Sequence, residues 1–237
     1  MAPANVPAMN RLISSLPLKD RTRLLASCEE VNLVLETVLG EPGDRIRHVY
    51  FPIASYISLV IPADGASSLE VGMIGNEGMY GASLILNVDV SPFHSLAQGE
   101  GPASRLTAAS FRREYQRSPA LQRELNRYLY VLMSQLAQSA ACTRFHVVEA
   151  RLARWLLMTQ DRAHSDVFPL TQQFLAWMLG VRRVGITKAA GALQKQKLIG
   201  YRRGNITILN RSGLEAVSCP CYKADWNVYS RMLPRAA

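Results

Sequence analysis

Residues 170–209 decide the fold, and they read LTQQFLAWMLGVRRVGITKAAGALQKQKLIGYRRGNITIL. Thr171 is well placed to cap a helix, because its hydroxyl can accept hydrogen bonds from backbone N–H groups two or three residues later. That helix is predicted to bury Phe174, Leu175 and Met178, and Gly180 then supplies the permissive backbone that a tight turn needs. The stretch therefore predicts a helix, a short turn and a second helix.

The second helix is predicted over residues 182–196, with polar side chains near its N-terminal half. The residues predicted to be buried are Val184, Ala189, Ala192, Leu193 and Leu198, and the polar group consists of Arg182, Arg183, Thr187 and Lys188. In a helix-turn-helix, the N-terminal residues of the second helix enter the major groove of DNA. Because arginine can bind the O6 and N7 atoms of guanine together, Arg183 and Lys188 are the predicted contacts, and Thr187 is expected to meet a phosphate or a thymine methyl group. Two adjacent arginines alone are typical of a solvated helix, so the prediction depends on the whole pattern.

A β-hairpin is predicted directly after this helix, in GYRRGNITIL at residues 200–209. Arg202, Arg203, Gly204 and Asn205 form its predicted tip, and Gly204 and Asn205 are expected to carry the positive φ angles of the turn. A hairpin in this position is the wing of a winged helix. Arginines at its tip are expected to contact phosphates, which adds affinity and salt dependence without base selection.

The charge distribution supports a polyanionic partner. The 237 residues carry 27 basic and 18 acidic side chains, a net charge of +9. Between Val167 and Leu214 there is no acidic residue. The basic residues in that segment are Arg182, Arg183, Lys188, Lys195, Lys197, Arg202, Arg203 and Arg211. This concentration favours nucleic acid as the partner of this segment.

The N-terminal half shows a different pattern. Residues 10–30 predict short helices, with Pro17 where a helix begins. From Val31 to about Leu106, short apolar runs alternate with turn signals such as GEPGD (40–44) and ADGAS (63–67). Strands at such spacing predict an antiparallel β-barrel or β-roll.

Residues 120–161 contain neither Gly nor Pro and predict two helices. In the first, Leu125, Leu129, Leu132 and Leu136 follow the spacing of a coiled-coil seam. The alternative is a helix lying on the core of its own domain, and the length of the segment favours a dimer seam slightly. In the second helix, HVVEARLARWLLMTQD (146–161), the apolar residues predicted to lie in the core are Val147, Leu152, Trp155, Leu156 and Met158.

The chain resembles the Crp/Fnr family of transcription regulators. The resemblance is most specific from Leu170 to Leu209 and rests on Leu170-Thr171, on Gly180 nine residues after Thr171, on Arg182, Arg183 and Lys188, and on Leu198-Ile199. It implies an α+β fold with a cyclic-nucleotide-binding-like antiparallel β-roll at residues 1–117, a dimerisation helix at 118–145 and a winged helix-turn-helix DNA-binding domain at 146–237. It also implies a homodimer on a roughly palindromic site in double-stranded DNA, with RNA polymerase as a further partner if the protein activates transcription.

By position, the resemblance makes Arg183 and Lys188 the main DNA contacts. Thr171, Gln172, Arg182 and Thr187 lie beside them in the predicted interface. Family members often carry an acidic residue after the arginine, where this chain has Val184, so a different operator preference is expected.

The predicted effector pocket contains Gly75, Glu77 and Gly78. In cyclic-nucleotide binders of this family, a Gly-Glu element and a later Arg-Ser or Arg-Thr pair hold the ribose and the phosphate. Here Asn76 stands between Gly75 and Glu77, so the glutamate does not directly follow the glycine. The segment SPFHSLAQ (91–98) supplies no arginine, so a buried phosphate would lack its charged partner. Cyclic AMP is therefore disfavoured, the effector is unknown, and the glycines, with Gly81, have turn formation as their alternative role.

No metal site or cofactor is predicted. Cys219-Pro-Cys221 is too closely spaced for the usual zinc knuckle, and no second pair is evident in the sequence to complete four ligands. These two cysteines are expected to be structural or exposed thiols, with reactive chemistry as the alternative, and Cys28 and Cys142 are expected to be free thiols. No role is assigned to the dispersed histidines, which are His48, His94, His146 and His164.

Other classes of protein are disfavoured. The sequence has no Ser-His-Asp arrangement, phosphate-binding loop or dinucleotide-binding glycine pattern, so an enzyme is not expected. It has no apolar run near the ~20 residues that cross a bilayer, and residues 1–16 lack the features of a secretory signal. A cytoplasmic protein without membrane contact is expected. The remaining alternative is a ligand-sensing module whose winged helix binds proteins, which the acid-free basic segment disfavours.

Overall fold

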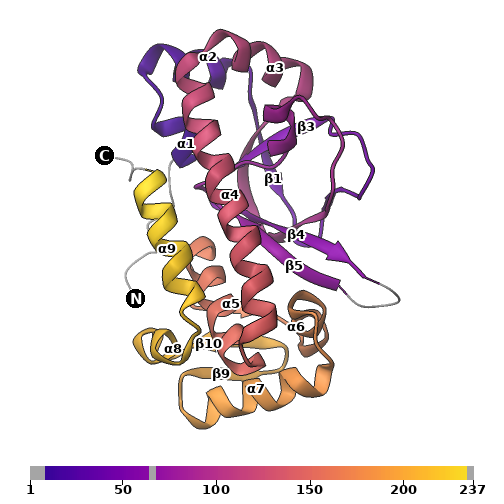
Figure 1. The fold of residues 1–237 in the computed structure, drawn as a ribbon, viewed down its shortest axis with the longest axis vertical. Helices are drawn as coiled ribbons and strands as arrows, with labels where there is room; N and C mark the ends of the chain where they lie inside the picture. The colour runs from indigo at the N-terminus through magenta and orange to yellow at the C-terminus, as the bar shows by residue number, and fades with distance from the viewer. Residues whose placement is uncertain (1–8, 64–67, 234–237) are drawn as a thin grey trace.

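The computed structural model describes residues 9–63 and 68–233 (Figure 1). The predicted turn ADGAS lies, apart from Ala63, outside the described residues, and so does the first half of the N-terminal stretch considered as a signal. Figure 1 shows a β-roll, a long helix α4 that runs beside it, and a second domain of helices and short strands at the far end of α4.

Two short helices precede the roll. They are α1 (Arg11–Ser14) and α2 (Leu18–Ala26), and Pro17 occupies the N-cap position of α2, where the sequence predicts a helix start. The buried side chain of Asn10 caps α1 and donates to the carbonyls of Pro52 (2.8 Å) and Gly78 (2.9 Å). These bonds fix the helices to the roll.

The β-roll consists of two antiparallel sheets, as predicted. Its strands are β1 (Glu29–Leu33), β2 (Val38–Gly40), β3 (His48–Pro52), β4 (Tyr56–Pro62), β5 (Ser68–Ile74), β6 (His94–Gly99) and β7 (Gly101–Thr107), and a 3-10 helix, η1 (Ala82–Leu86), follows β5. The orders are β1-β7-β3 and β2-β6-β4-β5. Phe51 and Ile57 are fully buried between the layers.

Two helices follow the roll, α3 (Ala108–Arg117) and α4 (Pro119–Phe145). Ser118 caps α4 by accepting from the N–H of Leu121 (3.1 Å), and Pro119 stands at the first helical position, where its missing N–H costs nothing. Leu121, Leu125 and Tyr128 pack into the core of the roll. The helix therefore completes the core of the N-terminal domain.

The burial of α4 corrects the predicted dimer seam. Leu125 is 0% exposed and Leu132 is 8% exposed, both in the core of their own chain, while Leu129 and Leu136 are half-buried at the edge of that core. Leu125 cannot contact a second chain without leaving the roll. Heptad spacing marks an apolar face but does not identify what covers it, and here the roll covers most of it.

The C-terminal domain begins with α5 (Val148–Ala163). It continues with β8 (Val167–Pro169), α6 (Gln172–Leu179), α7 (Arg183–Lys195), β9 (Ile199–Arg202), β10 (Asn205–Ile208), α8 (Arg211–Val217) and α9 (Cys221–Met232), and its sheet has the order β8-β10-β9. Leu152 and Leu156 lie in the core as predicted, but Val147 is 72% exposed, because it precedes α5 at the junction with α4.

Helix α9 returns from this domain along α4 (Figure 1). Leu233, just beyond α9, is buried in the N-terminal core, and its carbonyl accepts from the guanidinium of Arg11 (3.2 Å). The two domains are thus joined by α9 as well as by the α4–α5 junction. No described helix is both long and apolar enough to span a membrane.

Candidate nucleic-acid interface

The two helices predicted from residues 170–196 are α6 and α7. The hydroxyl of Thr171 accepts from the N–H of Phe174 (3.1 Å), as expected of an N-cap. Gly180 ends α6 in the left-handed conformation, with φ 62° and ψ 42°, which a residue with a side chain adopts only at a cost. The chain then turns at once into α7, so these elements form a helix-turn-helix.

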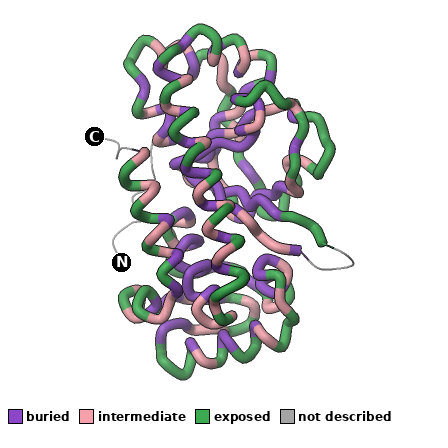
Figure 2. The backbone as a smooth tube through the Cα atoms, viewed as in Figure 1, coloured by how far each residue is buried: buried purple, intermediate pink, exposed green. Residues whose placement is uncertain are grey.

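Helix α7 buries one face and exposes the other. Ile186, Ala190 and Leu193 are almost fully buried at helical spacing, whereas Arg183 and Lys188 are exposed. Figure 2 shows this alternation along α7 at the base of the molecule.

The burial of Val184 is predicted wrongly. Its side chain is 59% exposed, and Ile186 occupies the core instead. The run Ile186, Ala189, Ala190, Leu193 fits the i, i+3, i+4, i+7 pattern and is the signal that identifies the buried face. Val184 is therefore an apolar side chain on the outer face.

Two of the residues predicted in the interface, Gln172 at the start of α6 and Thr187 in α7, contact each other. The hydroxyl of Thr187 donates to Oε1 of Gln172 (2.8 Å) and also to the carbonyl of Arg183 (3.1 Å). Thr171, Thr187, Arg182 and Arg183 are all exposed, and Gln172 is half-buried. The structure thus brings the predicted residues of α6 and α7 together on one exposed surface.

The wing is the hairpin of β9 and β10. Arg202 pairs with Asn205, which leaves a two-residue turn of Arg203 and Gly204 with φ angles of 50° and 77°. The positive φ predicted for Gly204 is observed, but the other residue is Arg203 rather than Asn205, because Asn205 is already the first residue of β10. Both arginines of the tip are exposed.

Most of the acid-free basic segment is available to a partner. Seven of its residues are exposed and form no ion pair with a described residue: Arg182, Arg183, Lys188, Lys195, Lys197, Arg202 and Arg203. Arg211 differs, since it pairs with Asp161 (2.8 Å) and Glu215 (2.9 Å). We call these seven exposed residues the basic surface.

Residues 150–217 match the family model of the Crp-like helix-turn-helix domain. This region is therefore similar to Crp-like helix-turn-helix domains. The match begins in α5 and ends with α8, so it contains the helix-turn-helix and the wing together. No curated protein is significantly similar in sequence.

Solved structures with the same fold are regulators of the Crp/Fnr family. A proposed Crp/Fnr-family transcriptional regulator of Eubacterium rectale superposes with a TM-score of 0.66 at 17% identity, over 87% of this chain and 96% of that one. FixK2 of Bradyrhizobium japonicum gives 0.64 at 13% identity, over 81% and 98%. The c-di-GMP-responsive regulator CLP of Xanthomonas campestris gives 0.63 at 18% identity, over 81% and 99%. The chain therefore shares the fold of these regulators, with a β-roll before the segment that matches the Crp-like model.

In the predicted effector pocket, protein side chains fill the space beside Gly75 and Gly78, and Glu77 lies at the edge of a cavity. Glu77 is buried and forms an ion pair with Arg162 of α5 (2.7 Å). A Cβ atom on Gly75 would lie 2.7 Å from the side chain of Arg162, and one on Gly78 would lie 2.6 Å from the hydroxyl of Tyr128. Both glycines permit close packing, which agrees with their alternative role as structural residues.

Two cavities lie near this region. Glu77 and Arg162 line one of about 260 Å³ together with Asp225 and Tyr229 of α9. Another, of about 180 Å³, lies between the roll and α4, and the described residues that line it include no charged side chain. The second cavity suits an apolar ligand better than a nucleotide, because a phosphate there would have no cation to bind.

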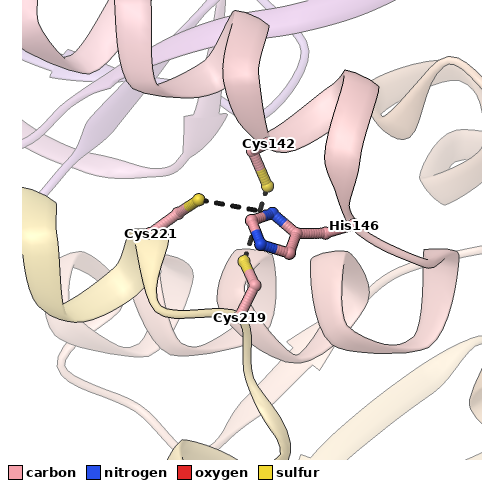
Figure 3. Close-up of side chains that lie close together, drawn as sticks. All are labelled: Cys142, His146, Cys219 and Cys221. Carbon is pink, nitrogen blue, oxygen red and sulfur yellow. Dashed lines mark hydrogen bonds between the residues drawn. The ribbon is translucent and has the colours of Figure 1, made fainter.

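A cluster of metal-binding residue types lies at the α4–α5 junction. Cys142, His146, Cys219 and Cys221 point toward one another (Figure 3), and their ligand atoms lie within 4.8 Å of one another. The expectation that nothing completes four ligands around Cys219 and Cys221 is therefore wrong. Cys142 and His146 are distant in sequence from Cys219 and Cys221. The four residues come together because α9 returns along α4.

Proposed function

We propose that the chain is a transcription regulator that binds double-stranded DNA through α7 and the wing. The observation that carries this proposal is the basic surface on a Crp-like helix-turn-helix. An exposed cationic helix beside a cationic hairpin suits the major groove and the phosphates that border it. The cytoplasm is the compartment that such a role requires.

The residues of the interface divide into two roles. Arg183, Lys188 and Thr187 lie in the first turns of α7, so we assign base and nearby phosphate contacts to them, with Arg182 beside them. Val184 is exposed on the same helix and offers an apolar contact to a thymine methyl group. Thr171 and Gln172 flank this surface at the start of α6.

Phosphate contacts are assigned to the wing. Arg202 and Arg203 flank or form its turn, and no described acidic residue pairs with them. Contacts of this kind hold the protein on any sequence and make binding dependent on salt.

We propose a homodimer formed through the outer face of α4. Tyr130 is 55% exposed and Met133 is 67% exposed, and Ala137 and Ala140 continue the same stripe at helical spacing. Leu129 and Leu136 lie at its margin. Two such helices in contact would present two copies of α7 to a roughly palindromic operator.

The proposal assigns one role to each of three consecutive segments. Residues 1–117 form a sensor roll, residues 118–145 a dimerisation helix and residues 146–237 a DNA-binding domain. Cyclic AMP is not the proposed effector, since Glu77 is already paired with Arg162 and the 91–98 segment contains no arginine.

Selection of bound sites from random duplexes, followed by a salt titration on the selected site, tests the proposal. We expect a sequence with two-fold symmetry to be enriched. We also expect the logarithm of the binding constant to fall with the logarithm of salt concentration, with a slope of about −0.9 for each phosphate contact. No enrichment together with a flat salt response would favour the protein-binding alternative.

A further inference from the structure

The Cys–His cluster combines two segments of the chain, residues 142–146 and residues 219–221. Cys142 lies in the last turns of α4, and His146 is the C-cap residue of that helix. Cys219 precedes α9, and Cys221 is its first residue. All three thiols are buried and free, and His146 is half-buried (Figure 3). Four inward-pointing side chains of these types are the full ligand set of a structural zinc site.

The distances fit tetrahedral coordination. The Sγ atoms of Cys142 and Cys219 are 3.5 Å apart, and Sγ of Cys221 lies 3.5 Å from Nδ1 of His146. Zn–S bonds of about 2.3 Å and Zn–N bonds of about 2.0 Å place tetrahedral ligands about 3.8 Å apart for two sulfurs and about 3.5 Å apart for sulfur and nitrogen. The longest separation in the cluster, at most 4.8 Å, closes with a small side-chain rotation.

We propose that Cys142, His146, Cys219 and Cys221 bind a zinc ion as a Cys3His site. Binding replaces the thiol protons with metal–sulfur bonds, so protons are released to solvent and no electron is transferred. The imidazole binds in its neutral form through the nitrogen that faces the thiols.

The surroundings of the cluster suit thiolates. Nε2 of Gln138 donates to Sγ of Cys221 (2.9 Å), a contact of the kind that orients metal ligands. The guanidinium of Arg154 lies near Cys142 and Cys219, where its positive charge favours thiolates. Arg154 is itself held by Asp225 of α9 (2.6 Å), so a cation stays beside a site that carries excess negative charge once three thiolates bind one Zn²⁺.

The position of the site gives it a mechanical role. His146 and Val147 are the only residues between α4 and α5, and both cysteines of the α9 segment bind from the other side. A metal here would hold the junction of the two domains and the start of α9 as one unit. Its loss would free the angle between α4 and the Crp-like domain.

The first experiment measures metal directly. The chain is produced without an oligohistidine tag, purified in the presence of a thiol reductant and analysed for metals by mass spectrometry. We expect about one zinc per chain. The Cys221→Ser and His146→Asn variants should lose most of it, and the matched Cys28→Ser variant, whose cysteine lies before β1, should keep it.

The second experiment keeps the proposal testable if those variants do not fold. Metal-free wild-type protein is titrated with Co²⁺, and we expect the intense visible bands of a tetrahedral site together with thiolate-to-metal charge-transfer absorption, saturating at about one Co²⁺ per chain and displaced by Zn²⁺. A weak spectrum without charge transfer would overturn the proposal. So would iron and inorganic sulfide in the protein as isolated, or a Cys142–Cys219 disulfide in reductant-treated protein.

The mechanical role rests on the proposed function and is tested separately. Operator affinity is compared between zinc-loaded and metal-free protein, and we expect the metal-free form to bind at least several-fold more weakly. Equal affinities would remove the mechanical role. Since metal content is measured without DNA, failure of the proposed DNA binding would not contradict the zinc site, and absence of zinc would not contradict the DNA binding.

Discussion

At the first turn of α7, the guanidinium of Arg183 is exposed and forms no ion pair with a described residue, while its backbone carbonyl accepts from Thr187 (3.1 Å). The helix backbone is therefore fixed and the side chain is free. Such a group binds a base edge without first breaking an internal contact, so most of its interaction energy is available for recognition.

Replacing Arg183 by alanine should reduce operator affinity by roughly tenfold to a hundredfold, because a bidentate contact to guanine contributes about 1–3 kcal/mol of discrimination. Preference at one base pair in each half-site should relax as well. Fluorescence anisotropy on the selected operator and its single-base variants measures both effects. Arg47→Ala removes an exposed arginine of the roll and is the matched control; unchanged affinity and selectivity for the Arg183 variant would remove it from the interface.

Glu70 connects the roll to the DNA-binding domain. Its carboxylate accepts from the hydroxyl of Ser58 (2.6 Å) and from Nε1 of Trp155 in α5 (3.0 Å). Burial raises the pKa of Glu70 from 4.5 to about 7, despite the opposing effect of these hydrogen bonds and of Arg162. The folded protein therefore holds a proton that the unfolded chain releases at lower pH.

The pKa of Glu70 makes stability depend on pH. Protonated Glu70 contributes fully to the free energy of unfolding below about pH 4.5. This contribution is lost as the pH rises to about 7, because Glu70 ionises over that interval in the unfolded chain but not yet fully in the folded one. The Glu70→Gln variant should therefore lose less stability between pH 5 and pH 8 than the wild type. Urea denaturation at both pH values measures the difference, and parallel pH profiles would contradict the raised pKa.

Among the elements, the wing has the simplest geometry. A two-residue turn with positive φ at Arg203 and Gly204 aims the hairpin tip at solvent, and β10 pairs with β8 on its other side. The strand β8 holds the hairpin against the domain, so the tip keeps a fixed position relative to α7.

Variants of the wing should weaken binding to all sequences alike. Arg202→Ala removes one charge, and Arg203→Gly removes the other while keeping the left-handed turn that glycine adopts readily. For each variant we expect the salt slope to become shallower by about 0.9, with base preference unchanged. Affinity lost at one base pair alone would instead place these arginines in base recognition.

Local pattern predicts elements whose signals lie within a few residues of one another. Thr171 and Gly180 mark α6 unambiguously, because capping and a left-handed turn are local requirements. Leu125 could not be placed correctly, since its periodicity is the same whether the roll or a second chain covers it. The Cys–His cluster is the extreme case: it depends on α9, a helix absent from the sequence predictions, packing beside α4.

For the whole molecule, the proposed dimer contact is the outer face of α4. Tyr130 and Met133 are large apolar side chains left in water by the described chain. A contact of two such stripes would bury them and leave the interior of each roll unchanged. The proposed dimer contact and the core thus use adjacent faces of one helix.

Charges on this outer face should prevent dimer formation. The double variant Met133→Glu, Ala137→Glu places like charges opposite one another across the proposed contact, so we expect a monomer with strongly reduced operator affinity. Sedimentation equilibrium gives the mass of the assembly. Leu18→Glu alters a 69% exposed leucine of α2 and should remain a dimer; a double variant that stays dimeric would exclude this face.

The burial of Leu233 beside the N-terminal core affects how the protein is made. The ribosome synthesises the roll first, yet Leu233, which packs in its core and whose carbonyl accepts from Arg11, is added more than a hundred residues after the last strand of the roll. Until then the nascent roll exposes an apolar surface that invites aggregation or chaperone binding. The roll thus reaches its final packing only after the C-terminal domain has been translated.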